Sequence, residues 1–262
     1  YNTAVDFKNL VPMITVSLGV SALPALAEAW TVKDKAAVKS AVNTVIRVSM
    51  LIALPAGIGM GVLAEPILTL IYGRGRMAAD IPMIAPMVAV FGFTTAFMSI
   101  STPLTNLLQA VGRTDIPVKT MLVSAVVKII CNFALVGIPG INFNGAVIGT
   151  VLFYVINVVL NIIAVIKVTK VRIDIMSGLI KPLISAVMCG LAAWAAYGLL
   201  GSYALKNVSH GSDIALLAAI IIAVMVYAIA ILVFKGVVRE DIESLPAGEK
   251  IAKILEKYKL LG

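Results

Sequence analysis

The chain of 262 residues is 61% apolar and only 13% charged, whereas soluble domains average about 45–50% apolar and about 25% charged residues. A soluble core could not bury so many apolar side chains, so this composition excludes an ordinary soluble domain. It predicts an all-α, polytopic transmembrane helix bundle. The net charge of +8 would suit nucleic acid, but the cations lie between apolar runs, and we therefore expect no nucleic-acid partner.

Seven segments are long and apolar enough to span a bilayer, which requires about 20 residues per helix. They cover residues 10–29, 44–72, 81–110, 118–136, 146–166, 179–200 and 214–234. The alanine-rich, charged residues 31–43 predict a short interfacial helix between the first two spans. We divide the chain into a transmembrane bundle, residues 1–234, and a basic amphipathic tail, residues 235–262. Because the chain starts at Tyr1 without methionine, we expect further sequence upstream.

The basic residues predict the orientation of the bundle in the membrane. If successive spans alternate in direction, sixteen of the 21 lysines and arginines lie on one side, in residues 33–47, 113–119, 167–181 and 235–259. Loops rich in lysine and arginine face the cytoplasm. We therefore predict a multi-pass protein of the cytoplasmic membrane with its C-terminus inside. The tail can lie on the anionic inner leaflet or remain solvated.

Prolines and glycines interrupt several of the predicted spans. Pro24 should bend the first span, and the sequence PAGIGMG at residues 55–61 should loosen the second. Its small residues favour close helix packing, with a hinge as the alternative. The span 81–110 is longer than a bilayer is thick and contains three prolines, so a tilted or broken helix is expected. The predicted structural or gating residues are Pro24, Glu28, Pro55, Gly57, Gly112, Arg113 and Pro139.

The sequence offers little to support catalysis. It contains no Ser/His/Asp set, no paired carboxylates at catalytic spacing and no phosphate loop. Cys131, Cys189 and His210 do not have the spacing of metal ligands. We therefore predict a protein that is not an enzyme and that needs no metal or cofactor.

Lys128 is the exception among the apolar runs, because it lies near the middle of the span 118–136. An ammonium at that depth costs roughly 2.5–3.5 kcal/mol on insertion scales, so a partner or an aqueous cavity is expected beside it. The alternatives are an ion pair with Glu65 or snorkelling to the interface. Asn157 and Asn161 could instead be interhelical hydrogen-bonding groups. The candidate cavity residues are Lys128, Asn132, Asn106, Gln109, Asn157 and Asn161.

Several motifs resemble one family of membrane proteins. The stretch LLQAVGRTDIPVKT, the apolar helix with Lys128 and Asn132, and the stretch PGINFNGAVIGT follow one another, and SALPALAEAW and LPAGIGMGVLAEPILTLIYG lie upstream. This order resembles the polysaccharide biosynthesis and export proteins of the multidrug/oligosaccharidyl-lipid/polysaccharide superfamily, close to the stage V sporulation protein B and lipid II flippase branch. The resemblance covers residues 10 to about 234.

The resemblance implies a fold of two helical lobes with fourteen spans, of which this chain would supply helices eight to fourteen. The partners implied are membrane lipids, an anionic lipid-linked substrate and an N-terminal lobe outside this chain. The implied function is a flippase that moves a lipid-linked oligosaccharide or cell-wall precursor by alternating access. The alternatives are a cation-coupled multidrug exporter of the same superfamily and a non-transporting scaffold for envelope synthesis.

Overall fold

The structure is a computed structural model, and it describes residues 23–75, 77–138, 143–201 and 210–238. In these residues the secondary structure is helical, without strands, and six helices are long and apolar enough to cross a membrane. The all-α membrane bundle is therefore confirmed. Most of the first of the seven predicted spans, residues 10–29, lies outside the described residues, as do Pro139 and most of the tail.

The first described helices meet at a capped turn. Helix α2 (Leu23–Thr31) is followed by α3 (Lys35–Val62), and the Asp34 carboxylate accepts hydrogen bonds from the Ala36 and Ala37 amides at 2.9 and 3.1 Å. A side-chain cap of this kind fixes the start of a helix. The separate interfacial helix predicted over residues 31–43 is wrong, because most of that segment is the first part of α3.

The second predicted span is also not continuous. Helix α3 ends at Val62, and a distinct helix α4 (Ala64–Tyr72) follows after Leu63. Proline has no amide hydrogen, and its ring collides with the carbonyl four residues earlier. For Pro66 that carbonyl belongs to Val62, so the α3 helix stops there. Pro55, where the sequence suggested loosening, lies within the continuous α3 helix.

The remaining helices agree closely with the predicted spans. A short 3₁₀ turn η1 (Ala78–Asp80) leads into α5 (Ile81–Ala110), which is continuous through Pro86 and Pro103 and is not broken. The hairpin of α6 (Asp115–Val136) and α7 (Phe143–Thr169) follows. A π-helical turn η2 (Met176–Ile180) then precedes α8 (Lys181–Leu199) and α9 (Gly211–Val233).

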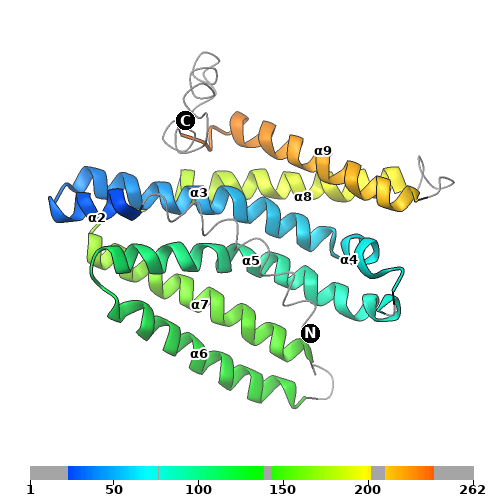
Figure 1. Cartoon of the computed structure of the whole chain (residues 1–262), viewed down its shortest axis with the longest axis horizontal. Coiled ribbons are helices and arrows are strands. Elements are labelled where there is room, and N and C mark those ends of the chain that lie inside the picture. Colours follow the sequence, from blue (N-terminus) through cyan, green and yellow to red (C-terminus); the bar gives the residue numbers. More distant parts are fainter. Residues whose placement is uncertain (1–22, 76, 139–142, 202–209, 239–262) are drawn as a thin grey trace.

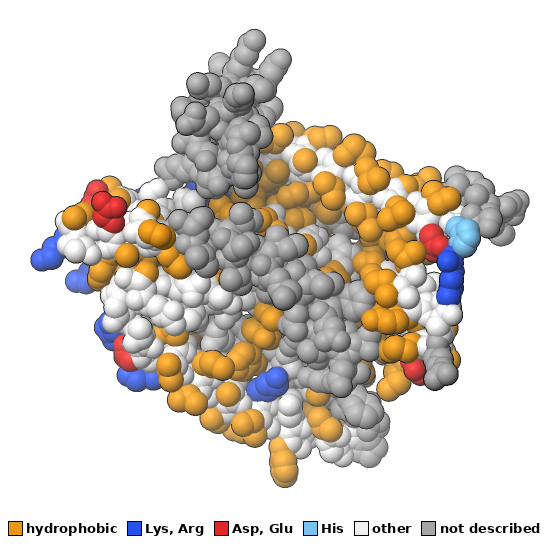
Figure 2. All heavy atoms as spheres, in the orientation of Figure 1, with side chains coloured by type: hydrophobic (Ala, Val, Ile, Leu, Met, Phe, Trp, Pro, Cys, Tyr) orange, Lys and Arg blue, Asp and Glu red, His pale blue; other side chains and the backbone are white. Residues whose placement is uncertain are grey.

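Helices α3 and α5 form the centre of the bundle (Figure 1). The α6–α7 hairpin packs on α5 through α7, and the α8–α9 hairpin packs on α3 through α8. The helices run back and forth along the long axis, so the α2–α3 turn, the α5–α6 turn and the end of α7 lie together at one end. We call this the basic end. Apolar side chains cover much of the surface between the ends (Figure 2), as expected for a lipid-facing bundle.

Glycines bring the two central helices into backbone contact. A Cβ atom added to Gly92 of α5 would lie 2.5 Å from the Gly61 nitrogen and 2.6 Å from the Gly57 oxygen of α3. Only glycine allows this approach. Small residues serve such contacts in membranes because van der Waals packing, rather than the hydrophobic effect, holds the helices together. The close-packing interpretation of residues 55–61 is the one the structure supports.

The proline in α3 also connects that helix to α9. Pro55 cannot donate to the Leu51 carbonyl four residues earlier. The Tyr227 hydroxyl of α9 donates to that carbonyl at 2.6 Å. A neighbouring helix therefore satisfies the backbone group that the proline leaves unpaired, which is how membrane helices tolerate internal prolines.

Candidate functional site

A seam of polar residues runs along the α6–α7 hairpin. On α6 they recur every fourth residue, as Thr120, Ser124, Lys128 and Asn132. On α7 the same spacing gives Gly149, Phe153, Asn157 and Asn161. Residues four apart share one face of a helix. Because the two helices are antiparallel, the two rows face each other in opposite order, and we call this surface the polar seam.

The end of the polar seam nearest the basic end is closed by hydrogen bonds. Thr120 Oγ1 donates to Asn161 Oδ1 at 2.7 Å, and Asn161 Nδ2 donates to Asn157 Oδ1 at 3.1 Å. Ser101 of α5 also donates to Asn157 Oδ1, at 2.7 Å. Asn157 and Asn161 are buried. They join α5, α6 and α7, in agreement with the interhelical hydrogen-bonding alternative.

Lys128 lies in the middle of the seam and faces an aromatic ring. Its Nζ atom is 5.8 Å from the centroid of Phe153 on α7, within the range of a cation–π contact. Glu65 is exposed on α4, which packs on α5 and α9. Within the described residues Lys128 therefore forms no ion pair with Glu65, and its charge is not neutralised by a carboxylate.

Asn132 is one turn beyond Lys128 and packs on the backbone of α7. Its amide oxygen occupies the place that a Cβ atom at Gly149 would need. That oxygen is buried and has no hydrogen-bond partner among the described residues. Buried amide oxygens are nearly always hydrogen-bonded. This acceptor therefore adds a buried polar group one helical turn from Lys128.

The other predicted polar residues lie apart from the seam. Asn106 is partly buried and Gln109 is exposed, both in the last turns of α5. Pro24 and Glu28 are exposed on α2. Gly112 has φ of +79°, a left-handed conformation that glycine adopts readily, so it shapes the α5–α6 turn.

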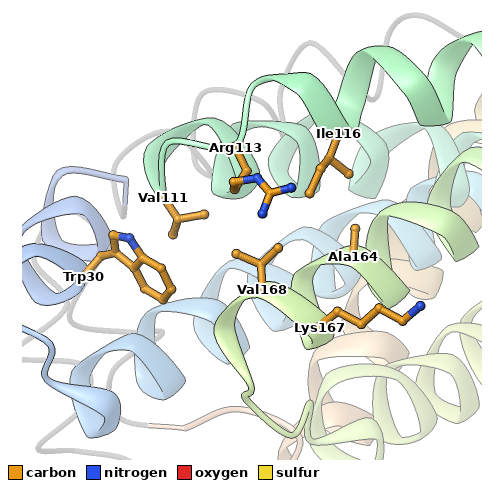
Figure 3. Close-up of a pocket in the computed structure, with 7 residues that line it drawn as sticks. All are labelled: Trp30, Val111, Arg113, Ile116, Ala164, Lys167 and Val168. Carbon is orange, nitrogen blue, oxygen red and sulfur yellow. The ribbon is translucent and has the colours of Figure 1, made fainter.

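The α5–α6 turn presents a cation to the basic end. Arg113 is 3.2 Å from Asp115, which also pairs with Lys119 at 3.1 Å. The Arg113 side chain extends over a cleft of about 470 Å³ (Figure 3), towards Val168. Lys167 lines the same cleft but extends along α7, and Trp30 of α2 closes the other side.

A second part of the basic end contains a buried arginine that sequence reasoning placed in a loop. Arg47 lies within α3 and is 6% exposed. It lines a cleft of about 470 Å³ with Asn43, Arg172 and Asp174. Burial raises the pKa of Asp174, but the Ser177 and Met176 amides and the Arg47 charge outweigh this effect and lower it below its usual value. The apolar neighbours on both sides of Arg47 in the sequence VIRVSM were the available signal for its burial.

An apolar groove lies on the opposite side of the bundle from the α6–α7 hairpin. It has a volume of about 570 Å³ and lies between α3, α4, α8 and α9. Its lining includes Pro55, Gly59, Cys189, Ala193 and Tyr227. Such a groove can hold a hydrocarbon chain, because it offers van der Waals contact with hardly any polar group.

The acidic residues of the described part all lie near helix ends, as the bounds of the helices show. They are Glu28, Asp34, Glu65, Asp80, Asp115, Asp174 and Asp213. Within the same residues, no group of three histidines, cysteines or carboxylates is close enough to hold a metal ion. Within the described spans, the charged groups away from the helix ends are therefore two cations, Arg47 of α3 and Lys128 of α6, accompanied by amides and hydroxyls.

The chain resembles known membrane proteins over nearly its whole length. The family model described as lipid II flippase MurJ matches residues 1–232. A probable lipid II flippase MurJ of Bdellovibrio bacteriovorus is 27% identical over 219 residues, which are 82% of this chain and 40% of the relative. Stage V sporulation protein B of Bacillus subtilis is 25% identical over 243 residues, 93% of this chain and 44% of the relative.

A third relative, lipid II flippase MurJ of Bacillus subtilis, is 22% identical over 147 residues, 55% of this chain and 26% of the relative. The chain thus spans less than half the length of these relatives. The family match extends from before α2 to the end of α9 and includes the central helices, the polar seam and the basic end. The chain therefore belongs to the lipid II flippase MurJ family of multi-pass membrane proteins.

Proposed function

We propose that this chain forms the part of a membrane flippase that handles a lipid-linked cell-wall precursor. The observation that carries this proposal is Lys128 within α6, which pairs with no carboxylate among the described residues, lies 5.8 Å from the Phe153 ring centroid and is one turn from the buried Asn132 acceptor. Intramembrane cations are costly and mark substrate pathways. A lipid-linked oligosaccharide carries a diphosphate, whose negative charge complements this ammonium. Asn106 and Gln109 remain further candidates for the path of its polar head.

The apolar groove between α3, α4, α8 and α9 suits the other part of such a cargo. Its lining is almost wholly apolar, and its volume of about 570 Å³ can take a stretch of a hydrocarbon chain. A polyprenyl tail held there would leave the head group free to move through a polar path. The N-terminal lobe that family membership implies would supply the other wall of that path and would rock against this chain.

In this proposal the basic end faces the cytoplasm, and so does the C-terminus. The described cations at that end include Lys33, Lys39, Arg113, Lys170 and Arg172, whereas Arg74 lies at the other end. Because the membrane potential is negative inside, it favours outward movement of negative charge by roughly 2.3 kcal/mol per charge per 100 mV. Transport in this direction needs neither a nucleotide nor an enzymatic step by this chain.

The test replaces Lys128 in the intact protein and measures flipping of a fluorescent lipid-linked oligosaccharide in vesicles. We expect Lys128→Gln to lower the flipping rate strongly, and Lys128→Arg to retain most of it because the charge remains. Lys119→Gln is the matched control, since Lys119 is an exposed lysine on the same helix that pairs with Asp115. Equal rates for the wild type and Lys128→Gln would remove Lys128 from the mechanism.

Two alternatives predict different results. A cation-coupled drug exporter needs an acidic residue deep within the spans, and the acidic residues of the described part lie near helix ends. A membrane scaffold predicts a dry, packed Lys128. A cysteine at position 128, with Cys131 and Cys189 replaced by serine, should react with a water-soluble maleimide if the protein is a transporter, and should not react if it is a scaffold.

A further inference from the structure

Three clefts at the basic end adjoin one another. The first lies between Trp30 and Lys33 and is not the cleft of Figure 3. It shares Lys35, Thr169 and Lys170 with the second cleft. The second shares Lys39 and Arg172 with the third, which surrounds Arg47. The three volumes are about 370, 330 and 470 Å³. We call these three adjoining clefts together the basic groove. It lies between the start of α3 on one side and the end of α7 with residues 170–174 on the other.

The charge of the basic groove is strongly one-sided. Six cations line it: Lys33, Lys35, Lys39, Arg47, Lys170 and Arg172. Asp174 is the one carboxylate among these lining residues, and its Oδ1 atom accepts hydrogen bonds from the Met176 and Ser177 amides. Asp34, next to Lys33, is likewise used as the cap of α3. Both carboxylates keep their charge when they accept hydrogen bonds from amides, but among the described residues six cations outnumber them.

The groove also has an apolar wall. Trp30, Val38, Val168 and Val171 line it between the cations. It lies where α3 and α7, two of the helices able to span the membrane, reach the basic end. An amphipathic tryptophan and a row of cations at the end of a span are typical of the membrane interface. The ligand that fits this lining combines an anionic phosphate with an apolar chain.

Two of the lysines hold an unusual backbone conformation at the same cleft. Lys33 has φ of 59° and Lys170 has φ of 56°, each in the turn that ends a helix, α2 or α7. Glycine or asparagine is the usual residue in this left-handed position, because a Cβ atom is disfavoured there. Here lysine occupies both positions and contributes both side chains to the groove. A lysine at the C-terminal end of a helix also interacts favourably with the helix dipole. That interaction affects the stability of the protein without lipid, whereas binding of a ligand is measured by its Kd.

We propose that the basic groove binds the phosphate head group of an acidic glycerophospholipid from the adjoining leaflet, at a site distinct from the polar seam. This proposal depends on the membrane orientation given under the proposed function, and not on the identity of the cargo. Bound lipid would bridge the α2–α3 turn and the end of α7, two segments from different hairpins. The acidic lipid content of the membrane would then control how firmly these segments are held together.

The test measures equilibrium binding to the intact protein in neutral detergent, with dioctanoyl phosphatidylglycerol as the ligand and dioctanoyl phosphatidylcholine as the uncharged comparison. The double variant Lys33→Gly/Lys170→Gly should retain its fold, because glycine relieves both left-handed positions. Its Kd for phosphatidylglycerol should rise about 25-fold, since each lysine near an acidic head group contributes a factor of about five. Its melting temperature without lipid serves as the check of folding.

Lys235→Gly is the matched control. Lys235 follows α9 with φ of 51° and is exposed, and it lies outside the lining of the groove. The proposal predicts an unchanged Kd for this variant, whereas a general loss of surface charge would raise it. Equal Kd values for the wild type and the double variant would overturn the proposal.

Two further ligands identify the source of the phosphate. If inorganic phosphate binds as tightly as the phosphatidylglycerol, the groove recognises a soluble anion, and the lipid proposal fails. If polyprenyl diphosphate binds more weakly to the double variant while phosphatidylglycerol does not, the groove serves the cargo, and the proposal again fails. Because binding rather than flipping is measured, neither failure affects the assignment of Lys128.

Discussion

The contact between α3 and α5 and the contact between α6 and α7 join neighbouring helices in different ways. Gly57, Gly61 and Gly92 bring the backbones of α3 and α5 together, and the buried Ser49 and Ser99 hydroxyls of these helices have no hydrogen-bond partner among the described residues. Helices α6 and α7 are joined instead by Thr120 and Asn161, and by Lys128 over Phe153. At these glycines the first contact leaves no space even for a Cβ atom. The second contains a charge and an open acceptor.

This difference fits different tasks for the two halves of the bundle. The α3–α5 pair is the frame on which both hairpins pack. Much of α6 is exposed, including Met121, Ile129 and Phe133, and it packs mainly on α7. A helix held by few partners can move at lower cost than a helix at the centre. We therefore expect substitutions in the glycine contact to affect stability and substitutions in the polar seam to affect transport.

Gly92→Ala should have the largest effect on stability. Its Cβ atom would collide with backbone atoms of Gly57 and Gly61, so α3 and α5 would have to separate, at a cost of about 2–3 kcal/mol. Gly59→Ala is the control, because nothing lies within 4 Å of a Cβ atom there. Thermal unfolding in detergent should show a lower melting temperature for Gly92→Ala only. Equal melting temperatures for both variants would contradict the backbone contact.

Asn161→Leu should have the next largest effect, because it breaks two buried hydrogen bonds, the one that Asn161 accepts from Thr120 and the one that it donates to Asn157. The Thr120 hydroxyl keeps the Pro117 carbonyl as an acceptor at 3.0 Å. The expected loss is about 1–2 kcal/mol of stability. A double-mutant cycle with Thr120→Val isolates the pair, and a coupling of about 0.6 kcal/mol is typical of membrane helices. Additive losses would show that the two residues act independently. The flipping rate should fall more than it does for Lys119→Gln, a substitution at an exposed residue of α6.

The sequence was sufficient to predict the helices but not their breaks. The span 81–110 coincides with α5, because a long apolar run between polar turns determines such a helix locally. Pro55 and Pro66 look alike in the sequence, yet α3 continues past one and stops before the other. At Pro55 the freed Leu51 carbonyl has a distant partner, the Tyr227 hydroxyl, 176 residues away along the chain. No local pattern contains that information.

For the candidate site too, the sequence indicates which residues share a helix face but not which residues of other helices they contact. The four-residue spacing of Thr120, Ser124, Lys128 and Asn132 is visible in the sequence, and it could have indicated one polar face on α6. The partners of that face could not be predicted, because Phe153 and Gly149 are apolar residues whose role depends on the register of the hairpin. Likewise, Arg47 is buried by the packing of α3, although it was expected in a loop.

Tyr227→Phe tests a third kind of helix contact, in which a side chain binds a backbone carbonyl. It is intermediate between the backbone contact of α3 with α5 and the side-chain contacts of α6 with α7. Its hydroxyl satisfies the Leu51 carbonyl that Pro55 leaves open. Removing it should cost about 1 kcal/mol, less than the expected change for Gly92→Ala. Tyr197→Phe is the control, since that hydroxyl contacts Ser212 at an exposed site. If Pro55→Ala is introduced as well, the Tyr227→Phe effect should shrink, because the helix then supplies its own donor.

The smallest effect is expected where helices meet through charges in water. Arg74 pairs with Asp213 at 3.0 Å and also contacts His210, at the end opposite the basic groove, and its side chain is 73% exposed. Exposed pairs of this kind contribute about 0.2–1 kcal/mol. Asp213→Asn should therefore lower the melting temperature slightly at low salt. The difference should vanish in 1 M salt, where the screening length is about 3 Å. A difference that persists at high salt would mean that Asp213 acts through packing or helix capping, and this end of the bundle would then resemble the α3–α5 contact more than its charges indicate.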